Sequence, residues 1–394
     1  MALFIGRDLK DDEDIYIEGD KSRSILICGK RGSGKSYTMG NIIEDIFEDI
    51  YSTQKKLVII IDPMGIYHTM VEPNYSQNNV LNKWGFNPKS YNVKLLVAGD
   101  PIENYAFGEE RILDKMKQRG VKFGSFKINP SDLSPDGWCD FFNLGMTDVQ
   151  GICLFRAIQN LKRRMGKSFY LSDIINAVEM DAKVQDRTRE ALLNRLEWAE
   201  SLNIFSQNYQ KFLDIFETDH INIIDMKSLD PGRYNLRNLI VSILTKQLFK
   251  ARLKARAMEE LEIFTDIPKV WLAIDEAHQF APSGKSTLAK EHLIRFVKEG
   301  RQPGLSLIVA SQQPSAIDSE ILSQCDLILC HKLTSKGDIH SINALSADYM
   351  GNELKTYIRK LGRVGEAVLV DDEKEKVGIV SIRPRRSNHG GGES

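Results

Sequence analysis

The chain has 394 residues, of which 42% are hydrophobic, so it is long enough for one large domain or two to three ordinary ones with a buried core. Its 53 basic and 54 acidic residues give a net charge of −1, so any surface that binds nucleic acid must be local. No apolar run approaches the roughly 18 residues of a membrane span, the N-terminus lacks a signal-peptide pattern, and the five cysteines form no C-x-x-C pair. We therefore expect a cytoplasmic protein with reduced thiols and no membrane contact.

After an acidic loop and a short edge strand at residues 15–17, the chain forms an apolar strand that ends in a glycine-rich loop. The loop pattern G-x-x-x-x-G-K-[ST] is met by Gly29, Lys30, Arg31, Gly32, Ser33, Gly34, Lys35 and Ser36. Its glycines permit backbone conformations in which successive N–H groups turn toward an anion. We predict a nucleotide site here. Lys35 would reach the β- and γ-phosphates, Ser36 would hold Mg²⁺, and the helix that starts at Tyr37 would direct its positive end at the phosphates.

Strand and helix patterns then alternate, which predicts an α/β fold with a parallel sheet. Strands are expected at residues 57–61, 93–97, 221–226, 270–274, 305–310 and 327–330, with a hairpin over 367–382. Helices are expected at residues 149–161, 171–180, 188–202, 236–261 and 287–299. Because the strand signal fades between about 101 and 217, we expect a core of 1–100 and 218–382, a helical insertion at 101–217, and a tail at 383–394.

Four of the predicted strands end in groups suited to nucleotide chemistry, and such ends meet at one edge of a parallel sheet. Besides the glycine loop, these groups are Asp62, the pair Asp275 and Glu276, and Gln312. Asp275 suits an outer-sphere Mg²⁺ ligand, and Glu276 suits the base or positioning group for a hydrolytic water. Gln312 could sense the γ-phosphate, and Asp62 could support the metal or the water. An isolated Asp-Glu pair would more often cap a helix, but the glycine loop favours the catalytic interpretation.

Arg301 lies before the strand that ends at Gln312. A strand of this length spans roughly 23 Å, so Arg301 belongs at the opposite edge of its own sheet. It is badly placed for its own nucleotide but could serve a neighbouring subunit as an arginine finger in trans. The alternative is a helix-terminal cation that interacts with the helix dipole.

Several motifs, taken in order, resemble the HerA branch of the HerA/FtsK ATPases. These are G-K-R-G-S-G-K-S, I-I-I-D-P-M-G-I-Y, W-L-A-I-D-E-A-H-Q-F-A-P, E-G-R-Q-P-G-L-S-L-I-V-A-S-Q-Q-P-S with I-L-S-Q-C-D, and the ending I-R-P-R-R-S-N-H-G-G-G-E-S. The resemblance covers about residues 20–70 and 220–394. It implies a RecA-like P-loop fold, with a mainly parallel sheet and an inserted helical subdomain, and a hexameric ring that uses ATP and Mg²⁺ to move double-stranded DNA.

On matching positions the resemblance implies roles that agree with those argued above. They are phosphate and Mg²⁺ binding by Lys35 and Ser36, metal and water binding by Asp275 and Glu276, sensing by Gln312, and a finger acting across subunits at Arg301. It also gives residues 383–386 a possible role in bracing an adjacent subunit. The chain departs from the family where Ile66 replaces a common Glu and Gln313 replaces a common Arg. We also expect no N-terminal β-barrel, since few residues precede Gly29, which puts docking to a nuclease in doubt.

The leading hypothesis is therefore a hexameric, Mg²⁺-dependent ATPase that translocates double-stranded DNA, as the motor of a nuclease-containing repair or antiviral complex. A second hypothesis is a DNA packaging or transfer motor. A third is an ATP-gated scaffold that organises an effector protein and moves nothing, which the near-neutral charge keeps open.

Overall fold

The computed structural model describes residues 2–48, 56–166, 169–206, 212–229, 235–345 and 353–391. Its strands form one sheet of twelve, in the order β2-β1-β12-β11-β10-β3-β9-β8-β4-β7-β5-β6. The strand bounds are β1 Ala2–Asp8, β2 Asp14–Glu18, β3 Ser24–Cys28, β4 Lys56–Asp62, β5 Val93–Ala98, β6 Lys122–Phe126, β7 Ile221–Asp225, β8 Lys269–Ile274, β9 Leu305–Ser311, β10 Leu327–Cys330, β11 Glu366–Asp371 and β12 Lys376–Ile382.

The part of the sheet from β10 to β6 is parallel throughout, whereas β11, β12, β1 and β2 extend one side of it in antiparallel pairs. Every residue of β4 and β9 is buried, as expected for parallel strands covered on both faces. The predicted α/β class is confirmed, because the sheet is mostly parallel and its parallel strands carry the glycine loop and the other three strand ends.

Helices cover both faces of the sheet. Those described are α1 Lys35–Glu48, α2 Asn78–Lys83, α3 Pro101–Asn104, α4 Glu110–Gln118, α5 Pro135–Phe141, α6 Val149–Met165, α7 Leu171–Glu179, α8 Asp186–Ser201, α9 Leu236–Glu260, α10 Leu288–Glu299, α11 Ser319–Leu322, α12 Lys336–Leu345 and α13 Glu353–Lys360. The apolar side chains of α1 pack into one core with the sheet, and those of α9 and α10 pack into a second core. Among the described helices, none is long and apolar enough to cross a membrane.

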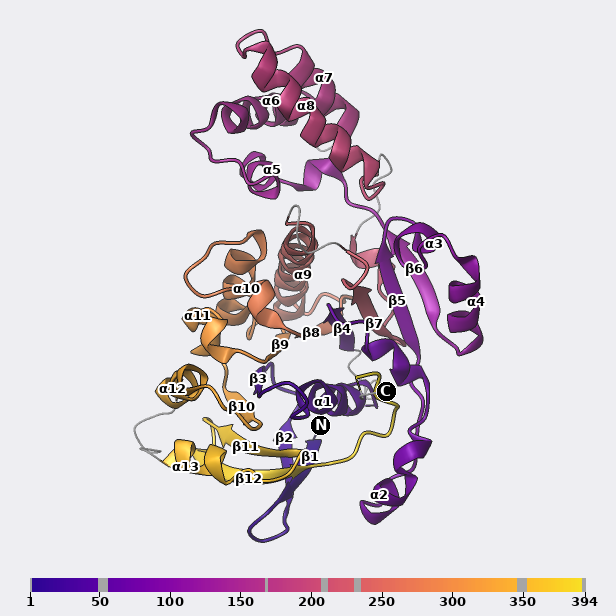
Figure 1. Ribbon diagram of the computed structural model, residues 1–394, viewed down its shortest axis with the longest axis vertical. Coiled ribbons are helices and arrows are strands. Elements are labelled where there is room, and N and C mark those ends of the chain that lie inside the picture. Colours follow the sequence, from indigo (N-terminus) through magenta and orange to yellow (C-terminus); the bar gives the residue numbers. More distant parts are fainter. Residues whose placement is uncertain are drawn as a thin grey trace.

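Helices α5 to α8 gather at one end of the molecule, beyond the ends of α9 and α10 (Figure 1). The helices predicted at 149–161, 171–180 and 188–202 are therefore present as α6, α7 and α8. Within the segment predicted to be helical, however, β6 adds an edge strand to the sheet along β5. Its sequence K-F-G-S-F has little apolar alternation, because an edge strand that is mostly half-buried or exposed needs little. Strand β1, which pairs with β2 and β12, was likewise not predicted.

The C-terminal tail packs on α1 of its own chain. Arg383 and Arg385 are both fully buried and lie beside the buried carboxylate of Glu44, with Nη1 of Arg383 at 3.1 Å and Nε of Arg385 at 3.6 Å. Arg386 pairs with Glu48 at 2.6 Å. Further along the tail, the ring of His389 lies edge-on to Tyr37. Residues 392–394 lie outside the described part of the chain.

Candidate nucleotide-binding site

The glycine-rich loop connects β3 to α1. Gly32 and Gly34 have φ angles of 73° and 108°, in the left-handed region that favours glycine. Position 29 requires glycine for lack of space, because an added Cβ would lie 2.5 Å from Ser33 Oγ and 2.6 Å from His331 Cβ. The loop therefore has the backbone form of a phosphate cradle at the N-terminus of a helix of 14 residues.

Lys35 lies inside this cradle. Its side chain is nearly buried, and its ammonium group donates a hydrogen bond to the carbonyl oxygen of Lys30 at 3.2 Å. Burial lowers the pKa of Lys35, while the nearby carboxylates of Glu276 and Asp275 act in the opposite direction. A phosphate group would supply the charged partner that this cation needs, so the cradle fits a nucleotide.

Ser36 and Asp275 are brought into contact, as the strand-end argument predicts. Asp275 Oδ2 accepts hydrogen bonds from Ser36 Oγ at 2.9 Å and from the Tyr67 hydroxyl at 3.0 Å. Burial and the neighbouring Glu276 raise the pKa of Asp275. A hydroxyl and a carboxylate are oxygen ligands of the kind that Mg²⁺ prefers, so the residues present fit this ion.

Glu276 and Gln312 also meet. The side-chain amide of Gln312 donates to Glu276 Oε1, and His278 Nδ1 lies 3.4 Å from Glu276 Oε2. Glu276 has a φ angle of 49°, a left-handed conformation that is uncommon for a residue with a side chain and that clusters at functional sites. The Glu276 carboxylate thus lies beside Gln312, the candidate sensor of the γ-phosphate, at the carboxyl ends of β8 and β9.

The carboxylate of Asp62 is hydrogen-bonded to the backbone of the loop that follows β4. Its two carboxylate oxygens accept hydrogen bonds from four successive backbone N–H groups, those of residues 64–67, at 2.7 to 3.1 Å. Burial raises its pKa to about 7. Asp62 therefore shapes the loop after β4 and places Tyr67, whose hydroxyl reaches Asp275.

Three residues of this region were given no role from the sequence. Tyr67 contacts Asp275, His331 lies under the glycine loop, and Asp225 ends β7 in register with Asp62. Asp225 could have been found, because the run I-N-I-I-D repeats the pattern of an apolar strand that ends in Asp. Tyr67 ends the motif I-I-I-D-P-M-G-I-Y, but its contact with Asp275, like the position of His331, depends on how distant segments pack.

Arg301 lies at the other edge of the sheet, just before β9, and is not part of this cluster. Its side chain is 61% exposed, and its guanidinium group pairs with Asp326 at 2.7 Å. The loop that carries it is fixed by Arg252, which is buried and donates from Nε to the carbonyl oxygen of Pro303 at 2.6 Å. The geometric part of the prediction, that Arg301 cannot reach its own nucleotide, agrees with this position.

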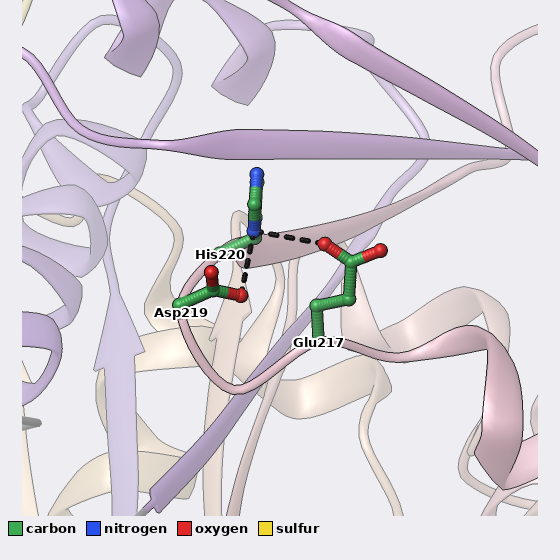
Figure 2. Close-up of side chains that lie close together, drawn as sticks. All are labelled: Glu217, Asp219 and His220. Carbon is green, nitrogen blue, oxygen red and sulfur yellow. Dashed lines mark hydrogen bonds and ion pairs between the residues drawn. The ribbon is translucent and has the colours of Figure 1, made fainter.

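A possible metal-ligand group elsewhere in the described residues consists of Glu217, Asp219 and His220 (Figure 2). It lies before β7, at the edge opposite the carboxyl ends of the strands. Glu217 is already paired with Lys94 at 2.7 Å and Lys122 at 2.6 Å. Because the ammonium groups of Lys94 and Lys122 already pair with the Glu217 carboxylate, we do not assign a metal site to these three residues.

Comparison with known proteins agrees with this arrangement. Residues 3–248 match the family described as the central domain of helicase HerA. A probable helicase of Methanocaldococcus jannaschii is 24% identical over 97% of this chain and 67% of its own length. The DNA double-strand break repair helicase HerA of Sulfurisphaera tokodaii is 22% identical over 97% of this chain and 69% of its own length. The chain thus spans about two thirds of each of these relatives.

Solved structures show the same fold. VirB4 of Thermoanaerobacter pseudethanolicus superposes with a TM-score of 0.57 at 17% identity, over 97% of this chain and 96% of that protein. The plasmid coupling protein TrwB, in complex with ADP and Mg²⁺, superposes with a TM-score of 0.53 at 11% identity, over 93% and 86% of the two chains. At such identities the likeness concerns the fold alone.

Proposed function

The chain belongs to the family of the HerA helicase central domain, and from that premise we propose that it is an ATPase that moves double-stranded DNA through a hexameric ring. The observation that carries the proposal is the meeting of the glycine loop, Ser36, Asp275, Glu276 and Gln312 at one edge of the sheet. Its cofactor would be Mg²⁺ and its substrate ATP. The names of its relatives favour a motor in DNA repair, and a nuclease or another effector protein would be its partner in a repair or antiviral complex.

In the proposed reaction, each residue of the candidate site has a separate role. Lys35 and the loop N–H groups would bind the β- and γ-phosphates, and Ser36 would hold Mg²⁺, with Asp275 behind it. The metal ion would neutralise charge that develops on the phosphates. Glu276 would orient the attacking water and accept its proton. Gln312 would register the γ-phosphate, because its amide already contacts Glu276.

In the proposed ring, each nucleotide site would also receive a residue from a neighbouring subunit. Arg301 would reach the nucleotide of a neighbouring subunit, which agrees with its exposed position at the opposite edge. We also propose that the chain consists of a core, a helical insertion within 101–217 and a tail from residue 383. The helical part of the insertion would start after β6, because β6 pairs with β5 in the sheet. Since the guanidinium groups of Arg383 and Arg385 are buried within their own chain, any brace to a second subunit would use other atoms of the tail.

The proposal is tested by ATP hydrolysis with and without double-stranded DNA. We expect Mg²⁺-dependent hydrolysis that DNA stimulates, together with rings in electron micrographs of the protein with ATP and DNA. Rings that hydrolyse ATP without any response to DNA would support the scaffold instead. A response limited to DNA in the presence of a capsid or a transfer apparatus would favour a packaging or transfer motor.

A further inference from the structure

His331 lies directly beneath the glycine-rich loop and is fully buried. It follows β10, and its backbone N–H donates to the carbonyl oxygen of Cys28, the last residue of β3, at 2.7 Å. An added Cβ at Gly29 would approach His331 Cβ to 2.6 Å, and one at Gly34 would approach its Cε1 to 3.5 Å. The ring thus lies against the underside of the loop, as its floor, and has no access to solvent.

Both ring nitrogens have hydrogen-bond partners from different parts of the chain. Nδ1 lies 2.9 Å from the carbonyl oxygen of Glu366, at the start of β11, and Nε2 lies 2.9 Å from Thr38 Oγ1 in α1. A carbonyl oxygen can only accept, so Nδ1 carries the proton and Nε2 accepts from the Thr38 hydroxyl. Burial lowers the pKa of His331 to about 4, which keeps this neutral tautomer at physiological pH.

Thr38 transmits this contact to the phosphate cradle. Its backbone N–H donates to the carbonyl oxygen of Gly34 at 2.8 Å, which closes the first turn of α1 beside Lys35 and Ser36. The hydrogen bond from Thr38 to His331 therefore links that turn to β10 and β11. A second link comes from Lys30, whose N–H donates to the carbonyl oxygen of Lys332 at 2.9 Å.

We propose that His331 is a positioning residue for nucleotide binding, which holds the glycine loop and the first turn of α1 in the phosphate-binding form through Thr38. This inference rests on the proposed nucleotide site. Without the hydrogen bond, conformations that cannot bind would become populated, and the apparent affinity would fall in proportion to the competent fraction. The chemistry of hydrolysis would be little changed, since among the described residues no hydrogen bond joins His331 to Glu276 or Gln312.

The test uses the full chain and a fluorescent ADP analogue. His331→Asn keeps a donor near the Nδ1 position but removes the acceptor for Thr38, and we expect about five- to tenfold weaker binding, the effect of one hydrogen bond. Thr38→Val, which removes the same bond with little change of shape, should weaken binding equally, and the double variant should lose little more. Thr38→Ser, which keeps the hydroxyl, should bind nearly normally. His340→Asn, an exposed position on α12, is the matched control.

Steady-state kinetics separate positioning from stability. We expect KM for ATP to rise by a similar factor in His331→Asn and Thr38→Val while kcat changes less than twofold, at temperatures well below unfolding. Unchanged affinity in both variants, or losses that multiply in the double variant, would overturn the proposal. If His331→Asn does not fold, the comparison of nucleotide affinity between Thr38→Val and Thr38→Ser tests the proposal by itself. Failure of the wild-type chain to bind ADP would instead reject the nucleotide site itself.

Discussion

The buried ion pairs between the tail and α1 allow the change in the free energy of unfolding to be predicted for a variant of Glu44. The Glu44 carboxylate has no exposed surface, pairs with Arg383 at 3.1 Å, and accepts hydrogen bonds from Ser387 N at 2.9 Å and Oγ at 2.6 Å. Glu44→Gln removes the charge and turns an amide NH₂ toward donors. Breaking a buried pair at one partner costs about 3 to 5 kcal/mol, and we expect about 3 because Arg383 keeps Asp45 at 2.7 Å.

The assay is urea unfolding of the wild type, Glu44→Gln and Glu48→Gln, followed by circular dichroism. Glu48 also pairs with the tail, through Arg386 at 2.6 Å, but its side chain is 29% exposed. Solvent screens such a pair, so Glu48→Gln should lower the free energy of unfolding by about 1 kcal/mol or less. Equal losses in the two variants would refute the reasoning, because burial would then not decide the strength of the contact.

Three further predictions concern the site. Glu276→Gln should still bind ATP but hydrolyse it at least about a hundredfold more slowly, as measured by phosphate release; brisk turnover would remove Glu276 from the mechanism. Arg301→Ala and Lys35→Ala should each be inactive alone, yet an equal mixture should recover activity at about a quarter of the interfaces; no recovery at any ratio would leave the trans role without support. The unfolded chain protonates His331 between pH 6.5 and about 4 while the folded chain does not, so this residue lowers stability by up to about 3 kcal/mol as the pH falls through that window. Urea titrations at pH 7 and 5 should show a smaller acid-induced loss for His331→Asn than for wild type, and equal losses would contradict the low pKa.

The core of the site could be predicted because its determinants are local. A glycine loop after an apolar strand indicates a candidate phosphate site, and polar residues after buried parallel strands must share one edge of the sheet. Asp275 and Ser36, which are 239 positions apart, meet for this reason at 2.9 Å. The same argument placed Gln312 beside Glu276 and kept Arg301 away from both.

Other features depend on packing between distant segments, which leaves no periodic signal. His331 could be recognised as the floor of the loop only once β10 lies beside β3. From the sequence, residues 383–386 received only a possible role in bracing an adjacent subunit, whereas Arg383 pairs with Glu44 and Asp45 on α1 of its own chain. Strand β6 was missed because an edge strand needs little apolar alternation.

The central claim, ATP-driven movement along double-stranded DNA, is tested most directly by triplex displacement. A labelled third strand is bound to one end of a duplex, and its release by the full chain is followed with ATP and Mg²⁺. The account predicts release with ATP by the wild type and no release by Glu276→Gln, although both bind the nucleotide. Active ATP hydrolysis on this duplex without any release of the third strand, in rings seen to enclose the DNA, would contradict translocation.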